Sequence, residues 1–181
     1  MPICWINGAF GVGKTTTAKA LAKQWTGSHL FDPEQIGFML RKVLPREVQT
    51  ADFQDLPLWR QLTVVTLTDL ARQRPIIVPM TLVNQEYFDE IVGALRRDGL
   101  DVYHFTLLAS RDTLRKRIRG RLLLPQAKRW VRAQMERCVT TLESPVFAVH
   151  IETDNRSAGE IANDIRSRIQ NALQSEGFST R

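Results

Sequence analysis

Short apolar runs alternate along the chain with longer segments in which apolar residues recur every three or four positions. The runs at 2–7, 75–80 and 101–108 lack a regular apolar–polar alternation, which is typical of parallel strands buried on both faces. We expect two further strands, a short one at 29–32 and the last at 146–153. These five segments predict a parallel sheet of about five strands.

The segments between these runs have helical periodicity. One helix starts at Lys14, one is ended by Pro45, one covers 57–73, and one stops near Gly99. Basic helices are expected at 111–121 and about 126–142, and a last helix opens at Ser157 and Glu160, which have capping-box spacing. The expected inward faces are Ala18, Leu21, Ala22 and Trp25; Ile36, Met39, Leu40, Val43 and Leu44; Leu58, Leu62 and Val65; Phe88, Ile91, Val92 and Leu95; and Ile161, Ile165, Ile169, Ala172 and Leu173.

Strands that alternate with helices predict a three-layer α/β/α fold, with helices on both faces of a parallel sheet. The chain has 181 residues, and no linker or internal repeat divides it. We therefore expect one domain, residues 1–181. With 43% hydrophobic and 24% charged residues, its composition is that of a globular protein.

The chain carries no sign of export or membrane insertion. Polar residues interrupt the first apolar run at once, and no stretch approaches the roughly 18 apolar residues of a spanning helix. Cys4 and Cys138 lie in no metal-binding pattern, which favours a reducing compartment. We expect a soluble cytoplasmic protein.

The segment between the first strand and the first helix carries the clearest motif. Gly8-Ala9-Phe10-Gly11-Val12-Gly13-Lys14-Thr15 matches GxxxxGK[ST], the phosphate-binding loop or P-loop. Glycines let backbone N–H groups approach phosphate oxygens, and the helix start adds a favourable dipole. We expect residues 8–16, including Thr16, to bind ATP. Lys14 would reach the β and γ oxygens and Thr15 would ligate Mg²⁺.

The usual strand-end acid that helps to hold Mg²⁺ is missing, because the strand at 75–80 is followed by Thr81. Asp32 follows the second strand and is the expected substitute. It would contact Mg²⁺, directly or through water, or accept the acceptor's hydroxyl proton. Asp32 followed by Pro33 also fits a helix N-terminal cap, and the two roles are compatible.

Positive charge is concentrated near residue 120. The net charge is +6, and residues 111–137 hold ten Lys/Arg and two Asp/Glu. Arg117 and Arg121 lie beside the apolar stripe of Leu114 and Ile118, and an inward-facing arginine needs a partner. We expect region 111–142 to be an Arg-rich lid whose Arg117 and Arg121 bind the γ-phosphate. A solvated basic face is the alternative.

Other residues are weaker candidates. Arg41 could hold an anionic group of the acceptor. Trp59, with Arg60 beside it, could stack on a base or sugar or could belong to the core. Asp154 lies in the turn after the last strand and could border the adenine, or the turn could be purely structural. The histidines receive no role.

A series of short motifs runs along the chain: Trp5-Ile6-Asn7-Gly8-Ala9-Phe10-Gly11, Gly13-Lys14-Thr15, Asp32-Pro33-Glu34, Gly37-Phe38, Leu40-Arg41, Asp52-Phe53, Pro57-Leu58-Trp59-Arg60, Ile77-Val78-Pro79-Met80-Thr81, Glu86-Tyr87-Phe88, His104-Phe105-Thr106-Leu107 and Thr153-Asp154-Asn155. In these motifs the chain resembles the ATP-binding tunicamycin resistance (TmrB-like) family over about residues 3–155. This resemblance implies a kinase-like P-loop fold, ATP binding through an essential Lys14, and resistance to tunicamycin, a uridine-containing nucleoside antibiotic. Family members can carry a basic amphipathic C-terminal helix linked to membrane association, which is not visible here, so we expect no peripheral attachment.

We expect a small-molecule kinase that transfers the γ-phosphoryl group of ATP to a hydroxyl of a nucleoside-like acceptor such as tunicamycin. Lys14, Asp32, Arg117 and Arg121 would be catalytic, and Asp32, Arg41, Trp59 and Arg60 would contact the acceptor. One alternative is a protein that binds ATP and sequesters the antibiotic without chemistry. Another is a nucleic-acid-binding ATPase, although the sequence holds no RNA-binding, helix-turn-helix or zinc pattern.

Overall fold

The fold is built on one five-stranded parallel sheet with strand order β2-β3-β1-β4-β5. The computed structural model describes residues 1–120 and 135–178. The strands are β1 (Ile3–Gly8), β2 (His29–Leu30), β3 (Ile76–Pro79), β4 (Val102–Leu108) and β5 (His150–Glu152). The expected parallel sheet of about five strands is confirmed.

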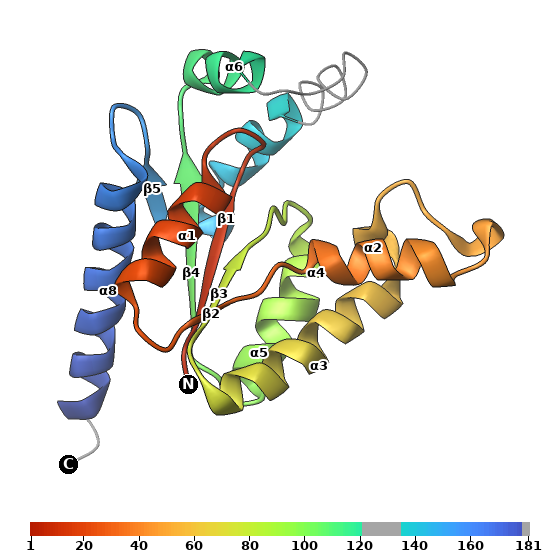
Figure 1. The fold of residues 1–181 in the computed structure, drawn as a ribbon, viewed down its shortest axis with the longest axis horizontal. Helices are drawn as coiled ribbons and strands as arrows, with labels where there is room; N and C mark the ends of the chain where they lie inside the picture. The colour runs from red at the N-terminus through yellow and green to blue at the C-terminus, as the bar shows by residue number, and fades with distance from the viewer. Residues whose placement is uncertain (121–134, 179–181) are drawn as a thin grey trace.

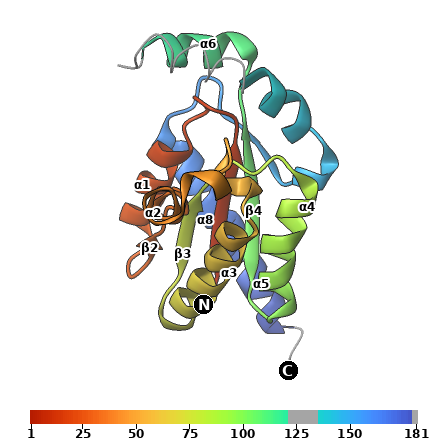
Figure 2. The same ribbon diagram turned by 90° about the vertical axis from the view of Figure 1, so that its right-hand side faces the viewer.

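Helices cover both faces of the sheet, as expected for three layers. The helices are α1 (Lys14–Gln24), α2 (Glu34–Val43), α3 (Pro57–Gln73), α4 (Gln85–Phe88), α5 (Ala94–Arg97), α6 (Arg111–Arg119) and α8 (Ala158–Phe178), and residues 135–142 are also helical. Figure 1 shows α1 and α8 on one face and α3 to α5 on the other. Figure 2 shows α6 above the carboxyl ends of the strands.

The central strands need no polar face because both sides are covered. All six residues of β1 and all four of β3 are buried. The register places Trp5 between Val78 and His104 on the neighbouring strands. Since parallel strands end at the same edge, the loops after β1, β2, β3 and β4 all meet there.

The expected inward face of α3 was wrong by one helical row. Leu58 and Val65 are exposed, whereas the buried row contains Trp59, Thr63 and Leu67. Thr63 is tolerated inside because its hydroxyl donates to the Trp59 carbonyl at 2.8 Å. The apolar pattern of the sequence therefore predicted the wrong row of α3 residues to be buried.

Three other apolar residues expected to be inward are exposed. Met39 and Val43 lie on the outer face of α2, and Leu173 lies near the end of α8. Only one side of each helix has a neighbour to pack against, and a narrow stripe is enough to fill it. The inward positions Leu40 and Ile169 are buried as expected.

Two elements differ in detail from expectation. The last strand lies within the expected range 146–153 but is shorter, because Pro145–Phe147 forms a 3₁₀ turn and β5 begins at His150. Proline fixes φ and lacks an N–H, which favours this turn start over a ladder position. The helix ending near Gly99 contains a π-helical turn at Asp89–Gly93 between α4 and α5.

His104 of β4 is buried within an aromatic cluster. Its ring lies 4.8 Å from that of Phe88 and 6.5 Å from that of Phe147. One ring nitrogen lies 3.2 Å from the Ala148 carbonyl oxygen, and the other lies 3.3 Å from the amide nitrogen of Asn7. Burial lowers the pKa of His104 to about 4, so the ring is neutral at pH 7.

We expect His104 to make the fold sensitive to mild acid. An unfolded histidine binds its proton near pH 6.5, whereas folded His104 does so near pH 4, so the unfolded state holds more protons between these values. The free energy of unfolding should fall by about 3 kcal/mol as the pH drops through this window. Urea titrations at several pH values measure this fall.

The comparison variants are His104→Gln and His29→Gln, because His29 is exposed. His104→Gln should lower stability at pH 7 but remove most of the slope between pH 6.5 and pH 4. His29→Gln should keep the slope. An unchanged slope in His104→Gln would show that other groups cause it.

Candidate functional site

The loop between β1 and α1 has the backbone shape that its glycines allow. Gly8 has φ of 145°, and a Cβ there would lie 2.7 Å from a methyl group of Val12 and 2.8 Å from the Leu107 carbonyl oxygen. Gly13 caps α1 in a left-handed conformation with φ of 111°. The first turn of α1 thus starts directly at the loop, with its positive dipole end toward it.

Lys14 lies across this loop. Its ammonium group donates to the carbonyl oxygens of Gly8 and Ala9, at 2.9 and 3.2 Å, and lies 5.6 Å from the centroid of the Phe10 ring. Thr15 and Thr16 are exposed on the first turn of α1. A positive side chain, exposed hydroxyls and a helix start therefore surround one concave loop, which fits a bound polyphosphate.

A buried amide fixes the start of the loop. The Asn7 side-chain oxygen accepts from the amides of Gly8 and Leu82 at 2.8 and 2.9 Å, and its NH₂ group donates to the Leu82 carbonyl at 2.8 Å. Asn7 is fully buried. These bonds join the end of β1 to the segment that follows β3.

Thr81 occupies the place where a strand-end acid was missing. Its hydroxyl donates to the Gly8 carbonyl at 2.9 Å. The segment after β3 therefore contacts the P-loop through a neutral hydrogen bond rather than a carboxylate. Thr81 also lines two cavities on the side of the loop that faces α2 and α4.

One cavity, of about 290 Å³, lies between the P-loop and the start of α8. It is lined by Gly11, Val12, Gly13, Thr16, Thr17, Arg117, Arg156, Ala158 and Ile161. We call it the nucleotide cavity, because it adjoins the loop and two guanidinium groups lie on its wall. Planar guanidinium groups stack well on aromatic bases.

Arg117 faces inward as expected, but its partners are oxygens of the protein: two backbone carbonyls and the Thr153 hydroxyl, at 3.3 Å. The guanidinium donates to the Val12 carbonyl at 2.8 Å and to the Thr153 carbonyl at 3.2 Å. Arg117 therefore ties α6 to the loop and to the end of β5. Arg121 and much of the lid expected at 111–142 lie outside the described residues.

Asp154 has a structural partner. Its carboxylate accepts from the Ser110 amide at 3.1 and 3.3 Å. Hydrogen bonding by the Ser110 side chain, and to a smaller extent by the Thr113 side chain and the Ser110 amide, holds the pKa of Asp154 below its usual value. This contact joins the ends of β4 and β5. Arg156, two residues further on, lines the nucleotide cavity and pairs with Asp164 at 3.1 Å.

A larger cavity, of about 510 Å³, opens on the other side of the loop. It is lined by Phe10, Glu34, Phe38, Arg41, Ala51, Asp52, Phe53, Gln54, Met80 and Thr81. Phe10, expected to bind the nucleotide, lines this cavity instead of the nucleotide cavity. Its ring contributes an apolar wall beside the loop.

Glu34 and Asp52 are the two carboxylates among the described residues that line this cavity. Burial raises the pKa of Glu34, the carboxylates of Asp32 and Asp52 raise it further, and Lys14 lowers it. Asp32 accepts from the Glu34 amide at 3.0 Å and thereby caps the first turn of α2. Asp32 therefore acts as a helix cap, which was one of its two expected roles. The side chain that lines the cavity is that of Glu34.

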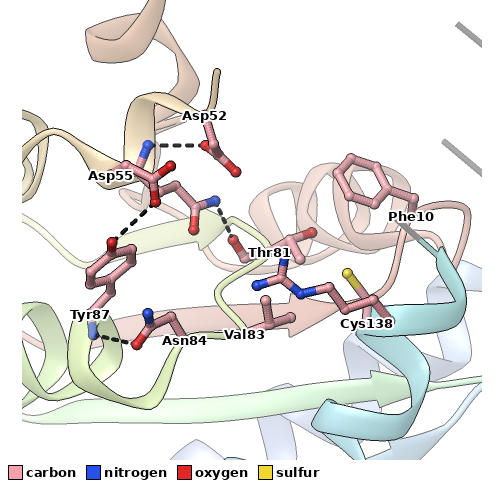
Figure 3. A pocket seen from close by; sticks show the side chains of 10 residues that line it. Phe10, Asp52, Asp55, Thr81, Val83, Asn84, Tyr87 and Cys138 are labelled. Atoms are coloured by element: carbon pink, nitrogen blue, oxygen red, sulfur yellow. Dashed lines mark hydrogen bonds between the residues drawn. The ribbon is translucent and has the colours of Figure 1, made fainter. Parts of the chain in front are cut away.

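A smaller cavity, of about 110 Å³, adjoins the larger one and shares Phe10, Asp52, Gln54 and Thr81 with it. Figure 3 shows Asp55 and Tyr87 on one side and Phe10 and Cys138 on the other. The Tyr87 hydroxyl donates to Asp55 at 3.1 Å, and Asn84 caps α4 by accepting from the Tyr87 amide at 3.3 Å. Together the two cavities form what we call the acceptor cleft.

Two expected substrate contacts are wrong. Trp59 is fully buried, its ring packs 5.3 Å from that of Phe53, and its indole N–H donates to the Pro33 carbonyl at 3.0 Å. Arg60 pairs with Glu90 at 2.5 Å and lies 4.1 Å from the centre of the Tyr87 ring. Both side chains support the wall of the cleft rather than line it. Arg41 does line it.

Within the described residues, no group of three or more His, Cys, Asp or Glu has the arrangement of a metal site. The hydroxyl of Thr15 and the carboxylates of Asp32 and Glu34 remain as oxygen donors near the loop. Helices of the described ranges are also too short or too polar to cross a membrane.

Sequence reasoning missed several residues of this site, namely Asn7, Glu34, Asp52, Asn84, Tyr87, Arg137 and Arg156. A signal existed for Asn7, the single strongly polar residue of an apolar strand directly before the first glycine. Glu34 stood within Asp32-Pro33-Glu34, but the role was assigned to Asp32. The other residues lie in loops and short helices, whose meeting point depends on tertiary structure.

Comparison with known proteins identifies what the chain is similar to. A family model described as an AAA domain matches residues 3–145. A tunicamycin resistance protein of Deinococcus radiodurans is 30% identical, with 94% of this chain and 96% of that chain covered and a TM-score of 0.78. Curated protein sequences gave no match.

More distant structures share the fold alone. A gluconokinase of Sinorhizobium meliloti is 17% identical, with a TM-score of 0.66 and coverage of 99% of this chain and 98% of that chain. The APS kinase of Mycobacterium tuberculosis is 15% identical, with a TM-score of 0.61 and coverage of 93% and 97%. The fold is therefore that of the P-loop kinases.

We expect Gly37→Ala to disturb the acceptor cleft. A Cβ at Gly37 would lie 2.5 Å from the Phe53 ring, so α2 and the cleft wall would have to separate. Overpacking of this kind costs about 1–3 kcal/mol, and it should outweigh the usual gain of about 1 kcal/mol for alanine in a helix. Denaturant titration measures the change.

Gly159→Ala is the matched helical control, because the nearest atom to its Cβ would be the Ser157 hydroxyl at 3.9 Å. It should leave stability unchanged or slightly raised. If Gly37→Ala were as stable as this control, the close packing of Phe53 against α2 would be refuted.

Proposed function

This chain belongs to the AAA domain family and to the tunicamycin resistance proteins, and on that premise we propose that it is an ATP-dependent phosphotransferase. It transfers the γ-phosphoryl group of ATP to a hydroxyl of a small nucleoside-like acceptor. Tunicamycin is the first candidate, because the relative from Deinococcus radiodurans is a tunicamycin resistance protein. The proposal places this reaction in the cytoplasm, where ATP is available.

The observation that carries the proposal is the position of the acceptor cleft. It opens beside the P-loop, on the opposite side from the nucleotide cavity, and a raised-pKa carboxylate, Glu34, lines it. A γ-phosphate on the loop would thus face a cavity of about 510 Å³, large enough for a small molecule. This arrangement supports transfer between two ligands rather than simple storage of one.

On the nucleotide side, the P-loop amides and Lys14 bind the β and γ phosphates. The adenine occupies the nucleotide cavity between Arg117 and Arg156, whose guanidinium groups face it. Arg117 is already held by the Val12 and Thr153 carbonyls. It therefore presents a preset surface to the base and needs little reorganisation.

The residues present fit a magnesium ion bound together with ATP. Thr15 offers an exposed hydroxyl on the first turn of α1, and Asp32 could reach the ion through water. When bound, the ion neutralises charge on the phosphates. Thr81 donates to Gly8 where many P-loop proteins place an acid, so this position supplies no carboxylate to the ion.

In the proposed reaction, the acceptor hydroxyl oxygen forms a bond to the γ-phosphorus. The bond between that phosphorus and the β–γ bridging oxygen breaks, and ADP leaves. Glu34 takes the hydroxyl proton, since its raised pKa makes it a better base than an exposed glutamate. Lys14 stabilises the charge that develops on the transferred group.

The first test is ADP release by purified protein with Mg²⁺-ATP, with and without tunicamycin. We expect tunicamycin-dependent release, with a product heavier by one phosphoryl group in mass spectrometry. Lys14→Ala should reduce the rate at least 100-fold, because the loop loses its charge on the phosphates. Lys19→Ala, an exposed lysine on the same helix, should leave it unchanged.

Tunicamycin binding without any change in its mass would favour sequestration and overturn the transferase proposal. Salt-dependent retention of RNA or DNA with no response to tunicamycin would favour the nucleic-acid-binding ATPase.

The ionisation of Glu34 should also determine how kcat/KM depends on pH. The carboxylate must be ionised to accept a proton, so activity should fall as the pH drops through its raised pKa, above the usual 4.5 of glutamate. Asp52→Asn removes a neighbouring negative charge, lowers the pKa of Glu34 and moves this acid limb to lower pH.

Glu34→Gln should lower kcat/KM by about 10²–10⁴-fold and remove the acid limb, that is, the fall of kcat/KM at low pH. Retention of the limb in Glu34→Gln would assign it to another group.

A further inference from the structure

The acceptor cleft differs in charge from the nucleotide cavity beside it. Among the described residues, the cleft is lined by three carboxylates, Glu34, Asp52 and Asp55, and by two guanidinium groups, Arg41 and Arg137. The lining of the nucleotide cavity includes Arg117 and Arg156 but, in the same part of the chain, no carboxylate. The nucleotide cavity is thus suited to an anion, and the acceptor cleft is not.

Arg41, the arginine that lines the larger cavity, already has partners within the protein. The Arg41 guanidinium donates to the Ala51 carbonyl at 2.9 Å and lies 5.4 Å from the centroid of the Phe53 ring. Binding a phosphate normally takes several converging donors, of which bidentate arginines are the strongest. Arg41 shares the larger cavity with Glu34 and Asp52, and Arg137 shares the smaller one with Asp52 and Asp55. Each cavity thus pairs one guanidinium group with two carboxylates, which is not the converging set of donors that a phosphate needs.

The excess of carboxylates in the acceptor cleft contrasts with the positive net charge of the whole chain. The chain carries a net charge of +6, which favours the approach of an anion such as ATP. Local groups dominate inside a partly closed cavity, because solvent screens them less. Selection among acceptors therefore depends on the cleft residues rather than on the overall charge.

We propose that the acceptor cleft selects uncharged, hydroxyl-bearing acceptors against phosphorylated ones, with Asp52 as a specificity-determining residue. The inference rests on the proposed function, since it assigns a substrate class to the same cleft. The larger compartment offers Phe38, Phe53 and Met80 to an apolar or planar part of the acceptor. The smaller compartment offers Asp52, Asn84 and Arg137, which suit a neutral group with both donors and acceptors.

Asp52 has this role because of its position and its fixed geometry. It lines both compartments, so an acceptor that fills either one lies near its carboxylate. One carboxylate oxygen accepts from the Gln54 amide at 3.0 Å and caps the short turn Phe53–Asp55. Asparagine can make the same cap. Asp52→Asn therefore removes the charge while keeping the local fold.

The test is calorimetric titration with matched pairs that differ by one phosphate: uridine and uridine 5′-monophosphate, and glucose and glucose 6-phosphate. Saturating Mg²⁺-ADP must be present, so that the phosphate of a probe cannot occupy the P-loop. Wild type, Asp52→Asn and Asp69→Asn are compared, the last changing an exposed acid of α3 that lines neither compartment of the cleft.

We expect wild type to bind the uncharged member of a pair at least tenfold more tightly than its phosphorylated partner. Asp52→Asn should reduce this ratio severalfold by tightening the phosphorylated probe, while Asp69→Asn should leave the ratio as in wild type. A general loss of folding would weaken both members of a pair alike and would not change the ratio.

Equal or tighter binding of the phosphorylated probes by wild type would overturn the inference and leave the phosphotransferase proposal standing. An unchanged ratio in Asp52→Asn would overturn the role of Asp52. If no member of any pair bound while Mg²⁺-ADP did, the assignment of the cleft as an acceptor site would fall, and this inference with it.

Discussion

The site depends on one buried amide, the side chain of Asn7. It satisfies the N–H groups of Gly8 and Leu82 and the carbonyl of Leu82, all within 2.9 Å. Unpaired, these buried groups would each cost about 1–3 kcal/mol, so the amide fixes where the chain leaves β1 and where it runs after β3. Asn7, together with the hydrogen bond from the Thr81 hydroxyl to the Gly8 carbonyl, consequently sets the P-loop and the wall of the acceptor cleft relative to one another.

The P-loop and the first turn of α1 contribute residues to both the nucleotide cavity and the acceptor cleft. Thr16 faces the nucleotide cavity with Arg117 and Arg156, whereas Phe10 faces the acceptor cleft with Glu34 and Asp52. Neighbouring positions of one short loop thus define both ligand sites. Under the proposed function, such a loop would hold the two reacting groups close together, and much of the rate gain in phosphoryl transfer comes from such positioning.

Much of the fold could be predicted from the sequence, because strong local patterns determine it. The apolar runs gave the buried strands, and the capping box at Ser157 and Glu160 is present, with the Glu160 amide donating to the Ser157 hydroxyl at 3.2 Å. Errors arose where tertiary contacts outweigh local pattern. Thr63 is buried because its hydroxyl has a backbone partner, and Trp59 is buried because α3 packs by a row of four-residue spacing. The cleft is assembled from segments up to about 130 positions apart, from Phe10 to Cys138, so no local motif could reveal it.

Asn7 and Arg117 have a common property with a consequence for how such proteins diverge. Their main partners are backbone groups: the amides and carbonyl around Gly8 and Leu82 in one case, and the carbonyls of Val12 and Thr153 in the other. Main-chain atoms survive almost any amino-acid replacement. These contacts therefore place little constraint on which side chains stand at Leu82 and Val12, whereas Asn7 and Arg117 must be kept, and Gly8 is constrained by its own backbone conformation. Contacts of this kind would leave few paired substitutions among homologues.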